Sequence, residues 1–207
     1  GTAVLNIDDS RVAAMGELAR SRGMQVVSFG QSTAADVQAH DLEVTASGTS
    51  CIIEAAGQSL PLRLRVLGAH HIGNALAAIA AAGVLGVSAS DAIARLETVE
   101  IAERWRMQPM GSDRVRIIND AYNASPDSMS AALRTLAQIT GPGERTVAVL
   151  GAMSELGETA GEEHDRIGLL AVRLNIQRIV VVGPEARRLY ISCLLYTSDA
   201  ADDLLCV

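Results

Sequence analysis

The chain lacks lysine, since all 17 basic residues among its 207 are arginines. A phosphate-binding loop of the G-x-x-x-x-G-K-[ST] type needs a lysine at the β- and γ-phosphates of the nucleotide. The sequence therefore excludes a loop of this type. If the protein uses ATP, we expect the cradle for the triphosphate to lie outside these residues.

Aromatic side chains are scarce as well, at 2% of the sequence, so the hydrophobic core must be built from Ala, Val, Leu and Ile. The formal charge of -7 argues against nucleic acid as a partner, because binding phosphates needs a dense basic patch. The sequence has neither an apolar run of about 18 residues nor a secretion-signal pattern, so we expect no membrane partner.

Cysteine is the third scarce residue type. Cys51, Cys193 and Cys206 have neither metal-ligand spacing nor the density of a disulfide framework. We therefore predict a cytoplasmic protein and assign no metal ligand in this chain.

The first part of the sequence predicts a mixed β-sheet. Apolar, β-prone runs at 2–7 and 24–29 flank a helical segment at 10–22, which makes a βαβ-like opening. Between 35 and 67, short alternating runs separated by glycine turns predict antiparallel hairpins with one solvent-exposed face.

Two helices are expected next. Apolar residues recur at helical spacing over 70–85, and a shorter helix capped by Ser88 or Ser90 ends at Leu96. A polar stretch then predicts a linker, and we place a domain boundary near Met107.

A second alternation of strands and helices follows the boundary. Continuously apolar strands that alternate with helices predict a parallel sheet covered on both faces. The expected elements are strands at 115–119, 146–150 and 178–182 and helices at 126–139 and 161–174, with Gly183-Pro184 opening another helix.

The first segment that could carry chemistry is a glycine turn feeding a helix, with His70, His71 and Asn74 in the first turns. Helix N-termini favour anions, and an Asn side chain offers both a donor and an acceptor to an adenine edge. The alternative is that these residues only cap the helix and expose a histidine pair.

The second segment lies near the predicted boundary, where Arg104 and Arg106 flank Trp105. Guanidinium groups bind phosphates in a bidentate manner, so this pair could clamp a phosphate. The alternative is two solvated arginines beside a Trp that fills the seam between domains.

The third segment is a polar loop after the strand at 115–119, and it contains Asp120, Tyr122, Asn123 and Ser125. Doubly wound sheets bind ligands at such loops, and a carboxylate there suits paired ribose hydroxyls. Ser125 followed by proline predicts a helix N-cap. The alternative is that Asp120 and Asn123 only turn and cap the loop.

The fourth segment, at 151–157, is a glycine-containing turn after a strand, which alone is common in α/β proteins. His164 follows it on a helix. We expect His164 to be exposed rather than catalytic, and we assign no catalytic residue in the chain.

Together, in order and spacing, these four segments resemble motifs of the Mur ligase family. Residues 68–76 are similar to the G-x-H-N-x-x-N-A motif, with His71 in place of its first Asn and its second Asn retained as Asn74. The resemblance assigns Asn74 to the adenine base, and His70 to the same cofactor site. It also places Arg104 near the nucleotide, although Glu103 replaces the usual glycine before it.

The third segment is the most specific, because D-x-Y-N-A-x-P-x-S-M resembles the family type that adds D-alanyl-D-alanine. The resemblance implies that Asp120 contacts the ATP ribose, and that Tyr122, Asn123 and Ser125 lie around the reacting substrates. The fourth segment is similar to G-x-M-x-E-L-G, with Ala152 where the family commonly has an acid.

The family resemblance implies an α/β fold with three domains in the whole protein. Residues 1–107 would be the rear of the central ATPase domain, with a mixed sheet and antiparallel hairpins. Residues 108–192 would be the front of the Rossmann-like C-terminal domain, with a parallel sheet. The implied reaction uses ATP and Mg²⁺ to join D-alanyl-D-alanine to UDP-N-acetylmuramoyl-tripeptide through an acyl phosphate, in an enzyme that we expect to be a monomer.

Both ends of the sequence look cut, so we expect an internal fragment without ligase activity of its own. Residues 193–207 resemble a translated sequencing adapter, and we predict a non-native tail; the alternative is a short amphipathic helix. Two other functions stay open. One is another ligase of the superfamily, adding a single amino acid or acting as a folylpolyglutamate synthase. The other is a non-catalytic nucleotide-binding module, although no G-x-G-x-x-G follows a strand here.

Overall fold

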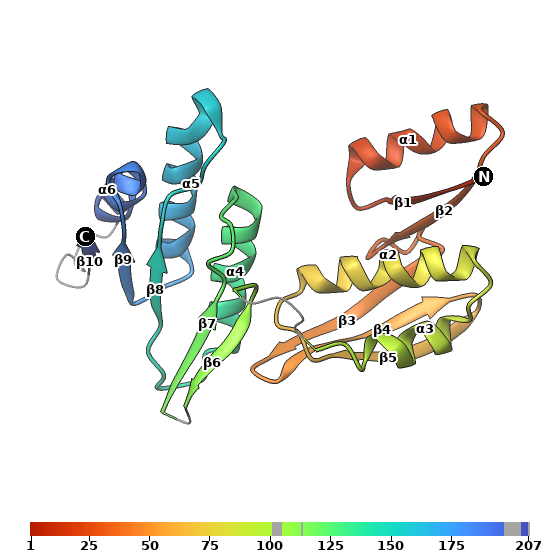
Figure 1. The fold of residues 1–207 in the computed structure, drawn as a ribbon, viewed down its shortest axis with the longest axis horizontal. Helices are drawn as coiled ribbons and strands as arrows, with labels where there is room; N and C mark the ends of the chain where they lie inside the picture. The colour runs from red at the N-terminus through yellow and green to blue at the C-terminus, as the bar shows by residue number, and fades with distance from the viewer. Residues whose placement is uncertain (101–104, 113, 197–203, 207) are drawn as a thin grey trace. The chain divides into compact units, whose positions relative to one another are not determined.

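The computed structural model describes residues 1–100, 105–112, 114–196 and 204–206 (Figure 1). The chain divides into two compact units, Gly1–Ala102 and Glu103–Val207, and each unit is described by itself. The predicted boundary near Met107 stays a prediction, and the contacts themselves divide the chain a few residues earlier.

The first unit is built on a five-stranded mixed sheet in the order β1-β2-β3-β4-β5. The β1, β2 and β3 strands are parallel, whereas β3, β4 and β5 are antiparallel neighbours. This arrangement confirms the predicted βαβ-like opening and the antiparallel hairpins. The strands are β1 (Thr2–Asn6), β2 (Gln25–Gly30), β3 (Val37–Thr45), β4 (Gly48–Ala55) and β5 (Gln58–Leu64).

Three helices belong to this unit, α1 (Ser10–Ser21), α2 (His70–Val84) and α3 (Ala89–Leu96). The starts of α1 and α3 follow from local capping. Asp9 accepts hydrogen bonds from two backbone N–H groups at the start of α1, and the Ser88 hydroxyl caps α3, which decides between the two predicted serines.

The core of the first unit is aliphatic, as the scarcity of aromatic residues predicts. The α2 helix packs Ile72, Leu76 and Ile79 against the sheet, where Ile53 and Leu62 are fully buried. The β1 and β2 strands lie between α1 and α2 (Figure 1).

The antiparallel half of this sheet keeps one face in contact with solvent, as predicted. Along β4, the buried residues Cys51, Ile53 and Ala55 alternate with the half-buried residues Ile52 and Glu54.

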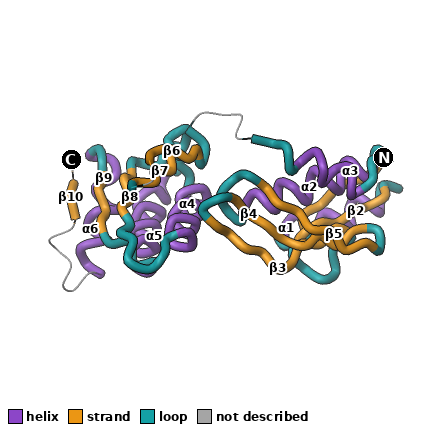
Figure 2. The backbone as a smooth tube through the Cα atoms, turned by 90° about the horizontal axis from the view of Figure 1, so that it is seen from below, coloured by secondary structure: helices purple, strands orange, loops and turns teal. Residues whose placement is uncertain are grey.

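The second unit begins with an antiparallel hairpin of β6 (Gln108–Ser112) and β7 (Val115–Asn119). A parallel sheet in the order β10-β9-β8 follows, and the α4, α5 and α6 helices pack against it (Figures 1 and 2). Its elements are α4 (Pro126–Ile139), β8 (Val147–Leu150), η1 (Gly157–Thr159), α5 (Ala160–Arg173), β9 (Arg178–Val181), η2 (Pro184–Ala186), α6 (Arg187–Tyr196) and β10 (Leu204–Cys206).

Two expectations for the second unit are wrong in detail. The strand at 115–119 pairs with β6, which was not predicted, and is not part of the parallel sheet. The parallel sheet is also covered on one face only within the described residues. Ala148 is buried under the helices, whereas its neighbour Val149 is 67% exposed, because alternate residues of a strand point to opposite faces.

The C-terminal residues partly belong to this fold. The α6 helix continues into the segment predicted to be a tail, and Cys193 is fully buried in the core of the second unit. The strand β10 pairs with β9 in parallel. Residues 197–203 and 207 lie outside the described residues, and the adapter origin of 193–207 stays a prediction.

Candidate functional site

The loop after β7 holds the acidic residue that the sequence analysis assigns to a ribose. The Oδ1 atom of Asp120 accepts a hydrogen bond from the backbone N–H of Met107, at 2.9 Å. No partner of its Oδ2 atom is found in the part of the chain that the structure describes. Asp120 can therefore offer one carboxylate oxygen to a ligand while the other is held by the protein.

The residues that open the second unit lie against this same loop. The Tyr122 N–H donates to the carbonyl of Trp105, at 3.0 Å. The Arg106 guanidinium lies over the Tyr122 ring, 4.1 Å from its centroid, in a cation–π contact. Arg106 therefore contacts an aromatic ring of its own unit, a contact that the sequence analysis missed.

Asn123 and Ser125 complete the loop. The Asn123 side chain accepts a hydrogen bond from the Ala124 N–H. Ser125 is the N-cap of α4 and forms a reciprocal capping box with Ser128, while Pro126 occupies the first helical position, as predicted. The Ser125 hydroxyl is thus used by the helix, and a substrate contact for Ser125 stays a prediction.

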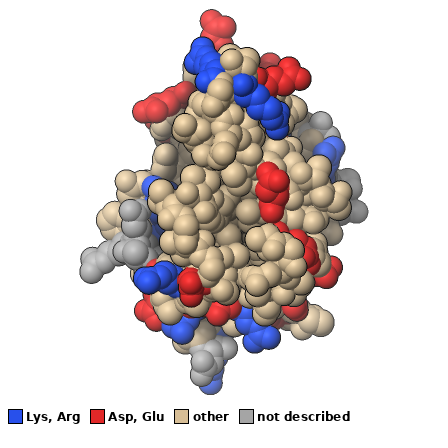
Figure 3. Space-filling view, turned by 90° about the vertical axis from the view of Figure 1, so that its right-hand side faces the viewer, with Lys and Arg blue, Asp and Glu red and all other residues tan. Residues whose placement is uncertain are grey.

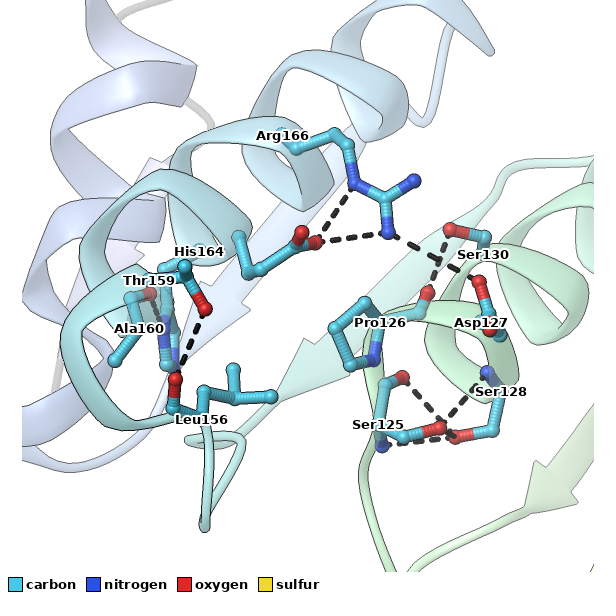
Figure 4. Close-up of polar contacts among 11 residues, drawn as sticks. Ser125, Pro126, Asp127, Ser128, Ser130, Leu156, Thr159, Ala160, His164 and Arg166 are labelled. Atoms are coloured by element: carbon cyan, nitrogen blue, oxygen red, sulfur yellow. Dashed lines mark hydrogen bonds and ion pairs between the residues drawn. The ribbon is translucent and has the colours of Figure 1, made fainter.

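His164 fixes the loop after β8, and the expectation that it is exposed is wrong. The residue is only 4% exposed. Its Nε2 accepts a hydrogen bond from the Met153 N–H at 3.0 Å. Its Nδ1 lies 2.6 Å from the carbonyl of Ala160, which is one turn earlier on α5 (Figure 4). A backbone N–H can only donate and a carbonyl can only accept, so the imidazole carries its proton on Nδ1. His164 is a structural residue here.

The signal for this burial lay in the helical spacing. His164 occupies the same stripe of α5 as Ile167, Gly168 and Ala171, which are all buried. Positions three, four and seven residues apart share one helix face, so the apolar partners of His164 predict an inward-facing ring.

An arginine links the starts of α4 and α5. The Arg166 guanidinium donates to Glu163 at 2.8 Å and lies 4.0 Å from Asp127 (Figure 4). These contacts bring the first turn of α4 beside α5, next to the loop that carries Asp120.

The start of α2, in the first unit, carries the other predicted nucleotide residues. His70 and Asn74 are exposed and lie one turn apart, on the same helix face. No side chain caps the helix at Ala69, so its first N–H groups are not used by a capping side chain. The capping alternative for this segment therefore loses support, while its binding role stays a prediction.

His71 is the less accessible member of the histidine pair. Its ring centroid lies 4.1 Å from that of His70. Burial and, to a smaller extent, the charge of His70 together lower the pKa of His71 to about 4. His71 is therefore neutral at physiological pH.

The remaining expectations concern Arg104, metal ligands, a membrane span and a basic patch. Arg104 lies outside them. Among the residues that the structure describes, no group of three His, Cys, Asp or Glu side chains could hold a metal ion. No helix in this part of the chain has the length and apolar character needed to cross a membrane. The face shown in Figure 3 carries intermixed arginines and carboxylates, without a dense basic patch.

Two family models match the chain. The Mur ligase middle domain matches residues 1–82, and the Mur ligase glutamate ligase domain matches residues 105–195. The UDP-N-acetylmuramoyl-tripeptide–D-alanyl-D-alanine ligase of Mycobacterium tuberculosis is 44% identical over 188 residues, a match that covers 88% of this chain and 36% of the relative.

Solved structures agree with these matches. MurF from Acinetobacter baumannii superimposes with a TM-score of 0.85 at 32% identity, covering all of this chain and 42% of that one. MurF from Thermotoga maritima, solved in complex with ADP, has the same fold, with a TM-score of 0.75 at 22% identity, over 49% of its length. The chain thus spans well under half of the length of the curated relatives it matches.

Proposed function

Since the chain belongs to the Mur ligase family, we propose that it is part of a ligase that joins D-alanyl-D-alanine to UDP-N-acetylmuramoyl-tripeptide with ATP. The observation that carries this proposal is the 44% identity over 188 residues with a ligase of that name. In the whole protein, ATP phosphorylates the tripeptide carboxylate. The dipeptide amine then attacks the acyl phosphate, and phosphate leaves from the tetrahedral intermediate as the amide forms.

In this chain we assign the adenosine side of the ATP site. Asn74, with His70 on the same helix face, offers donors and acceptors to the adenine base. Asp120 has a carboxylate oxygen available for ribose hydroxyls, because only its Oδ1 is used by the backbone of Met107. Arg104 is assigned to the nucleotide by family resemblance.

The triphosphate and metal side belongs to another part of the protein. The chain has no lysine for a phosphate loop, and its described residues offer no set of three metal ligands. We therefore propose that Mg²⁺ and the phosphates are held elsewhere, and that this chain alone has no ligase activity. Mg²⁺ would stabilise the charge on the transferring phosphoryl group.

The loop after β7 is the proposed substrate side. Tyr122 and Asn123 would lie around the reacting groups, as would Ser125 if its hydroxyl can serve both the α4 cap and a ligand. We further propose that the protein acts in the cytoplasm as a monomer. A ligase adding a single amino acid, or a nucleotide-binding module without catalysis, remains the rival function.

Binding of a fluorescent ATP analogue tests the site assignment. The Asp120→Ala and Asn74→Ala variants should each weaken binding by about tenfold, as expected when a hydrogen bond to the ligand is lost. Asp127→Asn is the matched control, because this exposed carboxylate lies in the neighbouring helix turn and is assigned no contact with the nucleotide. If Asp120→Ala and Asn74→Ala bind the analogue as the parent does, the nucleotide assignments are wrong.

A further inference from the structure

Five residues at the start of the second unit form one connected cluster, which we call the entry clasp. It consists of Trp105, Arg106 and Met107 on the entering segment and Asp120 and Tyr122 on the loop after β7. Three contacts join the two segments: Met107 N–H to Asp120 Oδ1, Tyr122 N–H to the Trp105 carbonyl, and the Arg106 guanidinium over the Tyr122 ring.

The backbone of the entering segment shows why these contacts are needed. Trp105 and Met107 have φ angles of 67° and 43°, although neither is glycine. Residues other than glycine rarely adopt this left-handed backbone conformation, and it persists only where the surrounding structure holds it. The backbone N–H of Trp105 donates a further hydrogen bond to the Gln108 side chain, and the Met107 side chain is buried.

We propose that the entry clasp is a positioning device for the nucleotide site, with Arg106 and Tyr122 as positioning residues. The Arg106–Tyr122 contact holds the entering segment against the loop, and the Met107 N–H then fixes the orientation of the Asp120 carboxylate. The Oδ2 atom is thereby aimed away from the bond to Met107 and left for a ligand.

The positioning role rests on the proposed function, whereas the contacts of the entry clasp do not.

Amide hydrogen exchange of the full 207-residue chain, measured by NMR without nucleotide, tests the clasp. The readouts are the Met107 and Tyr122 amides, which donate to the Asp120 side chain and to the Trp105 carbonyl. The Tyr122→Ala variant keeps both of these donors and both acceptors and removes only the ring. Exchange at Met107 should nevertheless become about threefold faster, the size expected from the loss of an exposed cation–π contact.

A change at Asp120 tests whether the coupling also runs in the other direction, from the Met107–Asp120 hydrogen bond to the Tyr122 amide. The Asp120→Ala variant should speed exchange at Tyr122 by about tenfold, because it removes the acceptor that holds the entering segment. Tyr122→Phe should restore the parent rate at Met107, and Asp120→Asn should recover part of the protection at Tyr122. A residue that acts only within its own segment would not change exchange at the amide of the other segment. Unchanged exchange at Ile167 and Ala171, in the buried stripe of α5, shows that the unit remains folded.

The proposal is overturned if Tyr122→Ala leaves Met107 exchange at the parent rate, or if Asp120→Ala leaves Tyr122 exchange at the parent rate, in a folded chain. Titration of an ATP analogue separates this outcome from failure of the proposed function. If the parent chain shows the coupled exchange but binds no analogue, the clasp stands and the nucleotide assignment fails.

Discussion

At the scale of single residues, His164 illustrates how a polar side chain can serve structure at the edge of a candidate site. Its two ring nitrogens join α5 to the loop after β8, through Ala160 and Met153. Because the ring is buried, neither backbone group has water as a ready replacement partner.

Removing this ring should destabilise the second unit. We expect His164→Ala to lower the free energy of unfolding by about 1–3 kcal/mol, because the Met153 N–H is left buried without an acceptor. His164→Asn should cost less, since its amide can reach the position of Nδ1 and still donate to Ala160. Urea denaturation measures both effects, and equal stability of His164→Ala and the parent would contradict this role.

Two histidines of the first unit, His71 and His40, should contribute to the free energy of unfolding with opposite pH dependences. The pKa of His71 is lowered to about 4 by burial, whereas the unfolded chain has a value of about 6.5. Between these values the unfolded state binds a proton that the folded state does not, so stability falls as the pH drops from about 6.5 towards 4. The His71→Asn variant, which cannot take up this proton, should lose less stability than the parent over this range.

His40 provides the internal comparison for that measurement. Hydrogen bonds to Glu54 and Asp41 raise the pKa of His40, so its contribution is present below about 6.5 and is lost as the pH rises through the folded value. His40→Asn should therefore be most destabilised, relative to the parent, at acidic pH. Urea unfolding at pH 8, 6 and 4.5 checks both signs. If the free energy of unfolding changes with pH equally in the parent and in His71→Asn, the loss of stability at acidic pH is not due to His71.

At the scale of elements, the β6–β7 hairpin depends on one glycine. Gly111 has a φ of 106°, and a Cβ atom there would lie 2.0 Å from the carbonyl oxygen of Val115 on the partner strand. The backbones of the two strands thus approach each other more closely than any side chain at 111 allows.

Replacing this glycine should disrupt the hairpin. We expect Gly111→Ala to reduce the free energy of unfolding of the second unit by about 1–3 kcal/mol through backbone strain, with a further loss from the steric clash. Gly151→Ala is the control, because a Cβ atom there meets nothing within 4 Å. Thermal unfolding followed by circular dichroism compares the two, and equal midpoints would falsify this reading of the hairpin.

The elements that were predictable are those whose signals are local. The start of α4 follows from Ser125-Pro126 and the end of α1 from Gly23, so both helices lie within a residue or two of the predicted positions. The β6 strand was missed because Gln108–Ser112 contains a proline and a glycine and shows no alternation. Its pairing with β7 lies within twelve residues, but it depends on the close approach of the two backbones at Gly111, which a search for alternating apolar residues does not detect.

The candidate site divides in the same way. Which loops follow which strands was predictable from the alternation of elements, and so Asp120, Tyr122 and Asn123 were correctly placed on the loop between β7 and α4. The bond from Met107 to Asp120 was not, because it requires left-handed backbone at two residues that rarely adopt it. The uncovered face of β8 was also missed, because an apolar strand looks alike in sequence whether one face or both are covered.

At the scale of the whole molecule, the chain has two units of one family with separate parts of a proposed site. The first unit carries His70 and Asn74 on α2, and the second carries Asp120 and Tyr122 after β7. The chain covers 36% of the length of its 44% identical relative. The proposal therefore assigns residues for adenosine to this chain, which has no lysine for the phosphates.

The central claim is that these residues belong to a ligase that adds D-alanyl-D-alanine. Replacing the matched segment of the Mycobacterium tuberculosis ligase with residues of this chain, and measuring phosphate release, tests it most directly. The account predicts ATP-dependent phosphate release that requires D-alanyl-D-alanine, needs a higher ATP concentration in the Asp120→Ala chimera, and is absent from the isolated chain. A folded chimera that releases phosphate with a single amino acid but not with the dipeptide, or with neither substrate, would contradict it.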